Sequence, residues 1–208
     1  MYSKHKKGKF VPVLLACAAV LAVVLLGSGI RAKYVTSVPL TGTVTIKGEL
    51  ADNVTLTEHK AERKSDGSYT LSETDITDHN EYIVMPGVDI PKDPTITIKD
   101  KSSVPAYLYV EIVDNSPGTA TYELTADWDP ITVADSARKV YFYNPALAVT
   151  TLQNIQILRD NKIIISDQYN PASAPFGLQF YVYMVQQDGS STAVDLFNSN
   201  FPTKPTTT

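Results

Sequence analysis

Two histidines, His59 and His79, are the imidazoles beyond residue 32 that could bind a metal or move a proton. Zinc hydrolysis needs three protein ligands, commonly including two histidines one helical turn apart, and a carboxylate that activates water. Neither histidine begins an H-E-x-x-H motif, and the nearest fragment, "HKAE" from His59 to Glu62, supplies one imidazole. We therefore expect two surface histidines on polar segments, and we assign no catalytic, cofactor-binding or metal-ligating residue.

Acidic residues gather in two places where oxygen atoms could hold calcium. One is "SETDITDHNE", and the other is "DWD", which places Asp127 and Asp129 around Trp128. Neither has the spacing of an EF-hand loop. We expect the first to be a solvated acidic loop and the second to be a strand in which Trp128 packs inward while both acids face water. The acids of the first segment are Glu73, Asp75, Asp78 and Glu81. Serine nucleophile elbows, P-loops and dinucleotide fingerprints are absent from the sequence.

Short alternating segments dominate the rest of the chain. "AYLYVEI" is the strongest, because Leu108, Val110 and Ile112 share one face and should be buried. We expect that face and Trp128 to be buried on opposing sheets. Similar β-prone pieces, bounded by turn residues, are "TVTIKGEL", "TITIK", "KVYFY", "KIIIS" and "FGLQFYVYMV". Without intervening helical periodicity, these segments predict an all-β fold, an antiparallel β-sandwich.

Six tyrosines lie on the phase opposite to the aliphatic residues of their strands. They would form either an adhesive outer sheet face or a second packed layer covered by a loop. The six are Tyr107, Tyr109, Tyr141, Tyr143, Tyr181 and Tyr183.

The N-terminus has the layout of a secretory signal, with four lysines before an apolar run over residues 10–26 and small residues after it. Cleavage is expected after Gly29 or Ala32. A permanent membrane anchor is the alternative, since the run reaches about 25 Å against a bilayer core of about 30 Å. The expected organisation is a signal helix at 1–32, an N-terminal segment at 33–43, a sandwich domain at 44–199 and a disordered tail at 200–208.

Removal of the signal changes the chemistry of the chain. The sequence has 18 basic and 22 acidic residues, and residues 1–32 hold five of the basic residues and no acid, so the net charge moves to near −9. This charge argues against nucleic acid or anionic lipid as a partner. The only cysteine, Cys17, lies in the signal, so residues 33–208 contain no disulfide or thiol. Membrane contact is expected only through the signal segment.

Several motifs resemble the TasA and camelysin family of exported proteins, which are processed by the signal peptidase SipW. The similarity covers the signal and roughly residues 82–198, and its most specific parts are "MPG" followed by "KDPTI", the Trp128 strand leading to "VYFY", and the closing "QQDG…TAVDLF". The resemblance implies a jelly-roll sandwich that is secreted to the bacterial cell surface and forms biofilm matrix fibres. Self-association into a homopolymer, with companion matrix or anchor subunits, would follow.

Two alternative functions are considered in addition to fibre formation. One is a monomeric secreted or cell-surface binding module. The other is a metalloendopeptidase like camelysin, for which the sequence offers no constellation of residues.

The segment "KYVTSVPL" at 33–40 is the candidate for strand exchange between subunits. Its apolar residues are Val35, Val38 and Leu40, and Pro39 interrupts it before the domain begins. A β-prone strand next to an N-terminus can pair with a neighbour's open sheet edge, and repetition of this contact grows a filament. The alternative is that the strand folds back onto its own chain.

Overall fold

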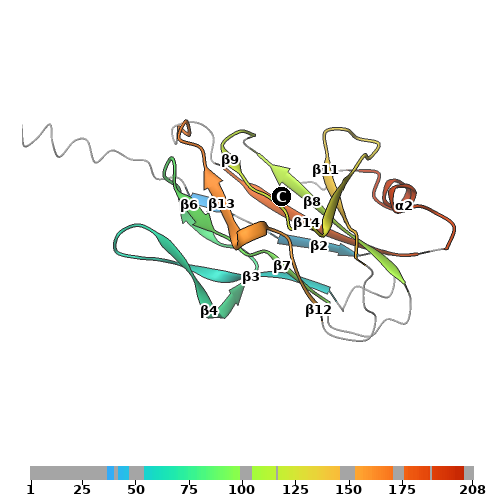
Figure 1. Cartoon of the computed structure of the whole chain (residues 1–208), viewed down its shortest axis with the longest axis horizontal. Helices are drawn as coiled ribbons and strands as arrows, with labels where there is room; N and C mark the ends of the chain where they lie inside the picture. The colour runs from blue at the N-terminus through green and yellow to red at the C-terminus, as the bar shows by residue number, and fades with distance from the viewer. Residues whose placement is uncertain are drawn as a thin grey trace, which may run out of the picture. The chain divides into compact units, whose positions relative to one another are not determined.

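The structure is a computed structural model that describes residues 37–39, 42–46, 54–98, 105–115, 117–145, 153–170, 176–187 and 189–203 (Figure 1). The backbone alone is described for 37–39 and 42–46. The chain divides into two compact units, Met1–Lys33 and Tyr34–Thr208, and all the described residues belong to the second. Five residues named above, together with the signal helix, lie outside the described residues: Cys17, Gly29, Ala32, Val35 and Leu40.

Strands make up most of the described chain. They are β1 (Ser37–Pro39), β2 (Gly42–Ile46), β3 (Val54–Arg63), β4 (Tyr69–Thr77), β5 (Glu81–Ile83), β6 (Asp89–Pro91), β7 (Thr95–Ile98), β8 (Ala106–Asp114), β9 (Ala120–Thr121), β10 (Trp128–Ile131), β11 (Lys139–Tyr143), β12 (Gln153–Gln156), β13 (Lys162–Ile165) and β14 (Leu178–Gln186). A 3-10 turn, η2 (Arg159–Asn161), precedes β13, and a helix, α2 (Ala193–Asn200), follows β14.

The strands form an antiparallel sandwich. One layer is a five-stranded sheet in the order β10-β11-β8-β14-β2, and the other contains the sheets β12-β7-β3-β4 and β6-β13-β9. β1 pairs with β5 in a separate two-stranded sheet. Every pairing is antiparallel except that of β2 with β14, which is parallel. The prediction of an all-β sandwich is confirmed.

The main core lies between these layers because each strand alternates apolar and polar residues. β7 buries Ile96 and Ile98 while its threonines face outward, and Leu108, Val110 and Ile112 of β8 are buried in the same cluster. β14 contributes Phe180 and Val182 opposite them. Alternation therefore positions one apolar face per strand, as period-two patterning requires.

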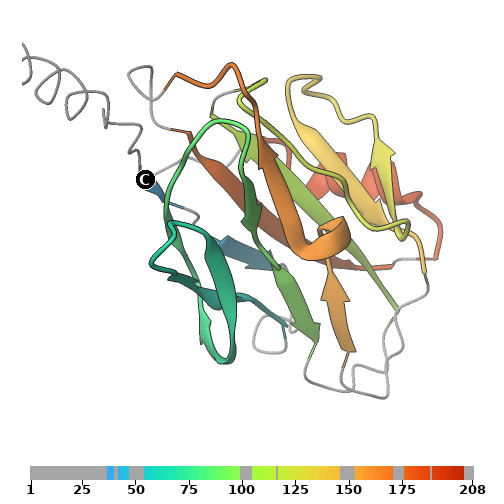
Figure 2. The same cartoon turned by 60° about the vertical axis from the view of Figure 1, so that its left-hand side comes forward.

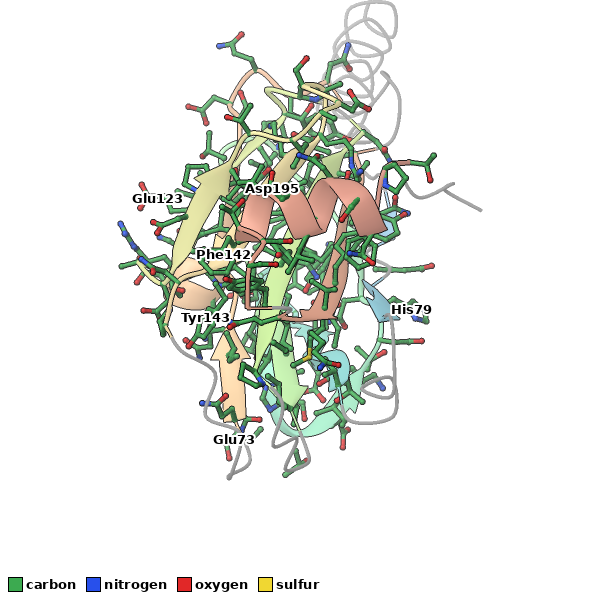
Figure 3. The ribbon with its side chains drawn as sticks, turned by 90° about the vertical axis from the view of Figure 1, so that its right-hand side faces the viewer. Glu73, His79, Glu123, Phe142, Tyr143 and Asp195 are labelled. Carbon is green, nitrogen blue, oxygen red and sulfur yellow. The ribbon has the colours of Figure 1, made fainter. Side chains whose placement is uncertain are left out.

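A second core lies on the other face of the five-stranded sheet, where α2 packs. Figure 1 shows α2 beside β8 and β11, and Figure 3 shows the same helix, marked by Asp195, crossing the sheet that carries Phe142. Leu196 and Phe197 of the helix and Phe201 after it pack on tyrosines from β8 and β14. Of the two alternatives for the tyrosine face, the structure shows the covered second layer, and the cover is a helix in place of a loop. Tyr109, Tyr181 and Tyr183 belong to it, whereas Tyr141 and Tyr143 pack on the main core.

Trp128 and β8 were expected on opposing sheets, and that prediction is wrong. β10 pairs with β11, and β11 pairs with β8, so Trp128 lies two strands from Val110 within one sheet. Its indole is 5% exposed and belongs to the main core, while Asp127 and Asp129 face solvent. The phase was read correctly, but alternation alone does not tell which sheet a strand joins.

The first part of the acidic segment, residues 72–77, belongs to the edge strand β4, although a loop was expected; Asp78 lies in the bend that follows, and Glu81 begins β5. β3 and β4 make a long hairpin, with Glu73 and Asp75 exposed on β4 (Figure 2). Charged residues on an edge strand oppose unwanted strand pairing, which accounts for their place here. The domain also extends past the expected boundary at 199, since α2 ends at Asn200 and Phe201 is buried.

Candidate functional site

His59 and Asp93 are joined by two polar contacts on the four-stranded sheet. Asp93 Oδ1 accepts a hydrogen bond from the His59 backbone N–H at 2.9 Å, and Oδ2 lies 2.5 Å from His59 Nδ1. The β3–β7 ladder reaches Thr57 opposite Thr95, and Pro94 has no N–H to continue it. The buried Asp93 carboxylate therefore continues the pairing of the two segments and also orients the imidazole.

Asn80 holds the kink that brings His59 to this position. The β3–β4 register shifts between His59 and Ala61, which interrupts the ladder. The Asn80 side chain accepts a hydrogen bond from the Ala61 N–H at 2.7 Å and donates one to the His59 carbonyl at 2.8 Å. Both backbone groups are thereby satisfied, as buried backbone groups generally are.

A polar groove of about 640 Å³ opens beside this pair, on the outward face of the four-stranded sheet. Thr57 and Thr95 lie opposite each other on its floor, and Thr97 Oγ1 donates a hydrogen bond to Asn154 Oδ1 at 2.9 Å. Ile76 of β4, 66% exposed, adds an apolar side chain to its lining. The other lining residues are Glu58, His59, Asp93, Thr125, Asp127, Tyr143, Ile155, Gln156 and Asn161. Hydroxyl, amide and carboxylate groups of this kind suit a polar ligand.

Below the groove, Lys92 and Glu58 form an ion pair in the interior. Lys92 is 1% exposed and Glu58 is 5% exposed, and Lys92 Nζ contacts Glu58 Oε2. Burial raises the pKa of Glu58 and lowers the pKa of Lys92 to about 8. Lys92 and Asp93 are consecutive, so the "KDP" turn sends one side chain into the core and the other to the groove.

A second buried ion pair fastens α2 to the sheet. Arg138 donates to both oxygens of Glu111, from Nε at 3.0 Å and from Nη2 at 2.8 Å. The Tyr183 hydroxyl donates to Glu111 Oε2 at 2.6 Å, and Arg138 Nη1 donates to the Phe201 carbonyl at 2.6 Å. The guanidinium also lies 4.9 Å from the Phe197 ring centroid. The network is structural, because it ties β8, β14 and the end of α2 together.

The N-terminal strands bear on the proposed strand exchange. Val38 lies in β1 and is paired in register with Tyr82 of β5 in the same chain. β2 follows and pairs with β14, from Gly42 opposite Phe180 to Ile46 opposite Met184. The single chain thus has the folded-back arrangement, which is the alternative to exchange.

The remaining predicted groups are separate from one another. His79 lies near the edge of the molecule in Figure 3, with its Nδ1 2.7 Å from Asp78 Oδ1, and it does not join His59 in the groove. Across the described residues, no group of three or more histidine, cysteine, aspartate or glutamate side chains is arranged to hold a metal ion. No helix in the described part of the chain is long and apolar enough to cross a membrane.

Sequence reasoning missed the buried charged residues and α2. Glu111 stands on the outward phase of β8, where a solvated position was the simpler reading. The sequence indicates the burial of Lys92 only weakly, through its position in the tight "PKDP" turn. The helix had a clearer signal: Thr192 and Asp195 form a capping box in which each side chain bonds the other's backbone N–H.

Comparison of the chain with models of known protein families, with curated proteins and with solved structures finds no match. The likeness to TasA and camelysin therefore remains a prediction that rests on the motifs given above.

Proposed function

We propose that this chain is a secreted structural protein of the bacterial extracellular or biofilm matrix, which assembles into fibres by exchanging N-terminal strands between subunits. The observation that supports the proposal best is that β1 pairs with β5 and β2 pairs with β14. Both strands come from the N-terminal end of the folded unit, and the pairing of β2 with β14 is the one parallel pairing in the described part of the chain.

The position of β2 matters because it occupies an edge of the five-stranded sheet. An edge strand is held on one side only, and its contacts are mainly backbone hydrogen bonds that an identical strand from another subunit could make equally well. β1 is attached still less, through the short strand β5. Exchange of these strands would keep every contact while linking subunits, as in domain swapping.

Such a contact is heterologous, since each subunit gives a strand to one neighbour and receives one from another. A heterologous contact that does not close into a ring grows a filament. Companion matrix or anchor subunits with the same acceptor edge would be compatible with this arrangement. The folded-back pairing is then the monomer's resting form.

Deletion of residues 33–40, which removes β1, tests the proposal. The full-length secreted protein should form filaments by negative-stain microscopy, whereas the deleted form should stay a soluble monomer. A synthetic peptide of residues 33–40 should bind the deleted form, because the deletion leaves β5 without its partner strand β1. Filaments that grow normally from the deleted form would refute the donor role.

A monomeric binding module is the second candidate, and the polar groove at His59 favours it. In that case the protein would elute as a monomer at every concentration, and substitution of groove threonines would change ligand binding without affecting its size.

A further inference from the structure

The Lys92–Glu58 pair is enclosed by both layers of the sandwich. Glu58 comes from β3, and Lys92 comes from the turn between β6 and β7. The Phe180 ring of the five-stranded sheet lies opposite, with its centroid 5.8 Å from Lys92 Nζ. The backbone of Lys92 is held as well, since its N–H donates to the Asn161 carbonyl at 2.7 Å. Both reactive ends are therefore fixed against each other away from water.

As an ion pair, this contact is incompletely satisfied. Glu58 Oε1 is buried and makes no hydrogen bond within the described part of the chain. Glu111, the other buried glutamate, has Oε1 bound by Arg138 and Oε2 bound by both Arg138 and Tyr183. A buried carboxylate with one oxygen left without a hydrogen bond favours its uncharged form. The surroundings of Glu58 thus differ from those of a glutamate whose role is to balance a cation.

The pKa values of both groups shift in the direction that amide formation requires. Burial raises the pKa of Glu58, which favours the carboxylic acid, and burial lowers the pKa of Lys92 to about 8, which favours the free amine. A free amine is a nucleophile, whereas an ammonium ion is not.

We propose that Lys92 and Glu58 condense into an intramolecular amide crosslink in the folded protein. Lys92 Nζ attacks Cδ of Glu58, a C–N bond forms, and one carboxyl C–O bond breaks. The departing oxygen leaves as water with two protons, one from the carboxylic acid and one from the amine nitrogen. The step needs no oxidant, reductant or co-reactant. It also stands whether or not the chain forms fibres.

Two physical effects favour this bond. The fold holds amine and acid in contact, so the reaction is effectively unimolecular and avoids the entropy cost of bringing two reactants together. The core also excludes water, which suppresses hydrolysis of the product. The crosslink would join two segments 34 residues apart in a chain that has no cysteine beyond Cys17 to form a disulfide.

The mass of the purified protein spanning residues 33–208 tests the proposal directly. Under denaturing conditions, the intact mass should fall below the sequence mass by one water molecule. Trypsin should fail to cleave after Lys92, because an acylated lysine is not a substrate. The digest should contain residues 48–60 joined to residues 65–99, with the link assigned to Glu58 and Lys92 by fragmentation.

A double variant, Glu58→Leu with Lys92→Met, is the matched control because it keeps the volume of the pair and removes both reactive groups. It should show its full sequence mass and unfold at a lower temperature than the crosslinked protein. The wild-type measurement does not depend on this variant folding.

Three results would overturn the proposal. One is the full sequence mass with normal cleavage after Lys92. Another is a loss of water located elsewhere, such as a succinimide at Asp66–Gly67. The third is a loss of ammonia with Asn80 in the crosslink, which would assign the neighbouring amide as the partner.

Discussion

Trp128 of β10 shows how one side chain can join strands of both layers. Its ring lies 5.2 Å from that of Tyr143, and its indole Nε1 donates to the Gln156 carbonyl at 3.0 Å. Gln156 ends β12 of the facing layer, so the hydrogen bond crosses the sandwich. The residue therefore combines apolar burial with a polar contact, as buried tryptophans usually do.

Substitution of Trp128 by alanine should lower the free energy of unfolding by about 3–5 kcal/mol, because it creates a cavity in the main core. Trp128→Phe should cost less, since it keeps an aromatic ring and loses the bond to Gln156. Urea denaturation followed by tyrosine fluorescence measures both variants. An unchanged midpoint for Trp128→Ala would mean that the indole contributes nothing to the core.

At the scale of the element, α2 depends on the ion pair beneath it. Arg138→Met should lower the free energy of unfolding by about 3–5 kcal/mol, since Glu111 would keep a buried charge without its cation. The double variant Arg138→Met with Glu111→Leu should recover most of that loss, because no charge is left buried. A thermodynamic cycle of the two singles and the double gives the coupling.

If the losses of unfolding free energy in the two single variants simply add in the double variant, the two side chains are not coupled. That result would contradict the buried pair. The near-ultraviolet circular dichroism signal should be reduced in Arg138→Met and largely recovered in the double variant, since Tyr183 and Phe197 lie at the contact between α2 and the sheet.

The elements also show what could be predicted from the sequence and what could not. β7, β8 and β11 were predicted because their alternation reflects one buried face each. α2 was missed because eight residues give little periodicity, although its capping box was visible. The outward phase of β8 was ambiguous, since tyrosine suits both an exposed and a covered face, and only the docking of α2 decides between them.

Charged residues in the core could not be located from sequence. Lys92 meets Glu58 across 34 residues, and Arg138 meets Glu111 across 27. Charged residues are seldom fully buried unless they are paired, so the reasonable expectation for each alone was the surface. His59 was expected at the surface, and its side chain is 41% exposed. Its contact with Asp93, however, depends on the register of β3 and β7, which alternation does not supply.

At the scale of the whole molecule, the proposed fibre requires β1 and β2 to move from their own chain to a neighbour. The residues paired in register would stay the same, and only the identity of the chain that contributes them would change. Ser37 of β1 lies opposite Ile83 of β5, which provides a position for a covalent test. Residues 33–208 contain no cysteine, so an introduced pair would be the only thiols.

The most direct measurement is therefore the disulfide pattern of the secreted variant Ser37→Cys with Ile83→Cys, oxidised after assembly and separated on a non-reducing denaturing gel. Strand exchange predicts a ladder of covalent multimers that collapses to a monomer on reduction, while the single variant Ser37→Cys gives no ladder. A disulfide-bonded monomer recovered from intact filaments would contradict the account, because it would show that β1 stays on its own chain.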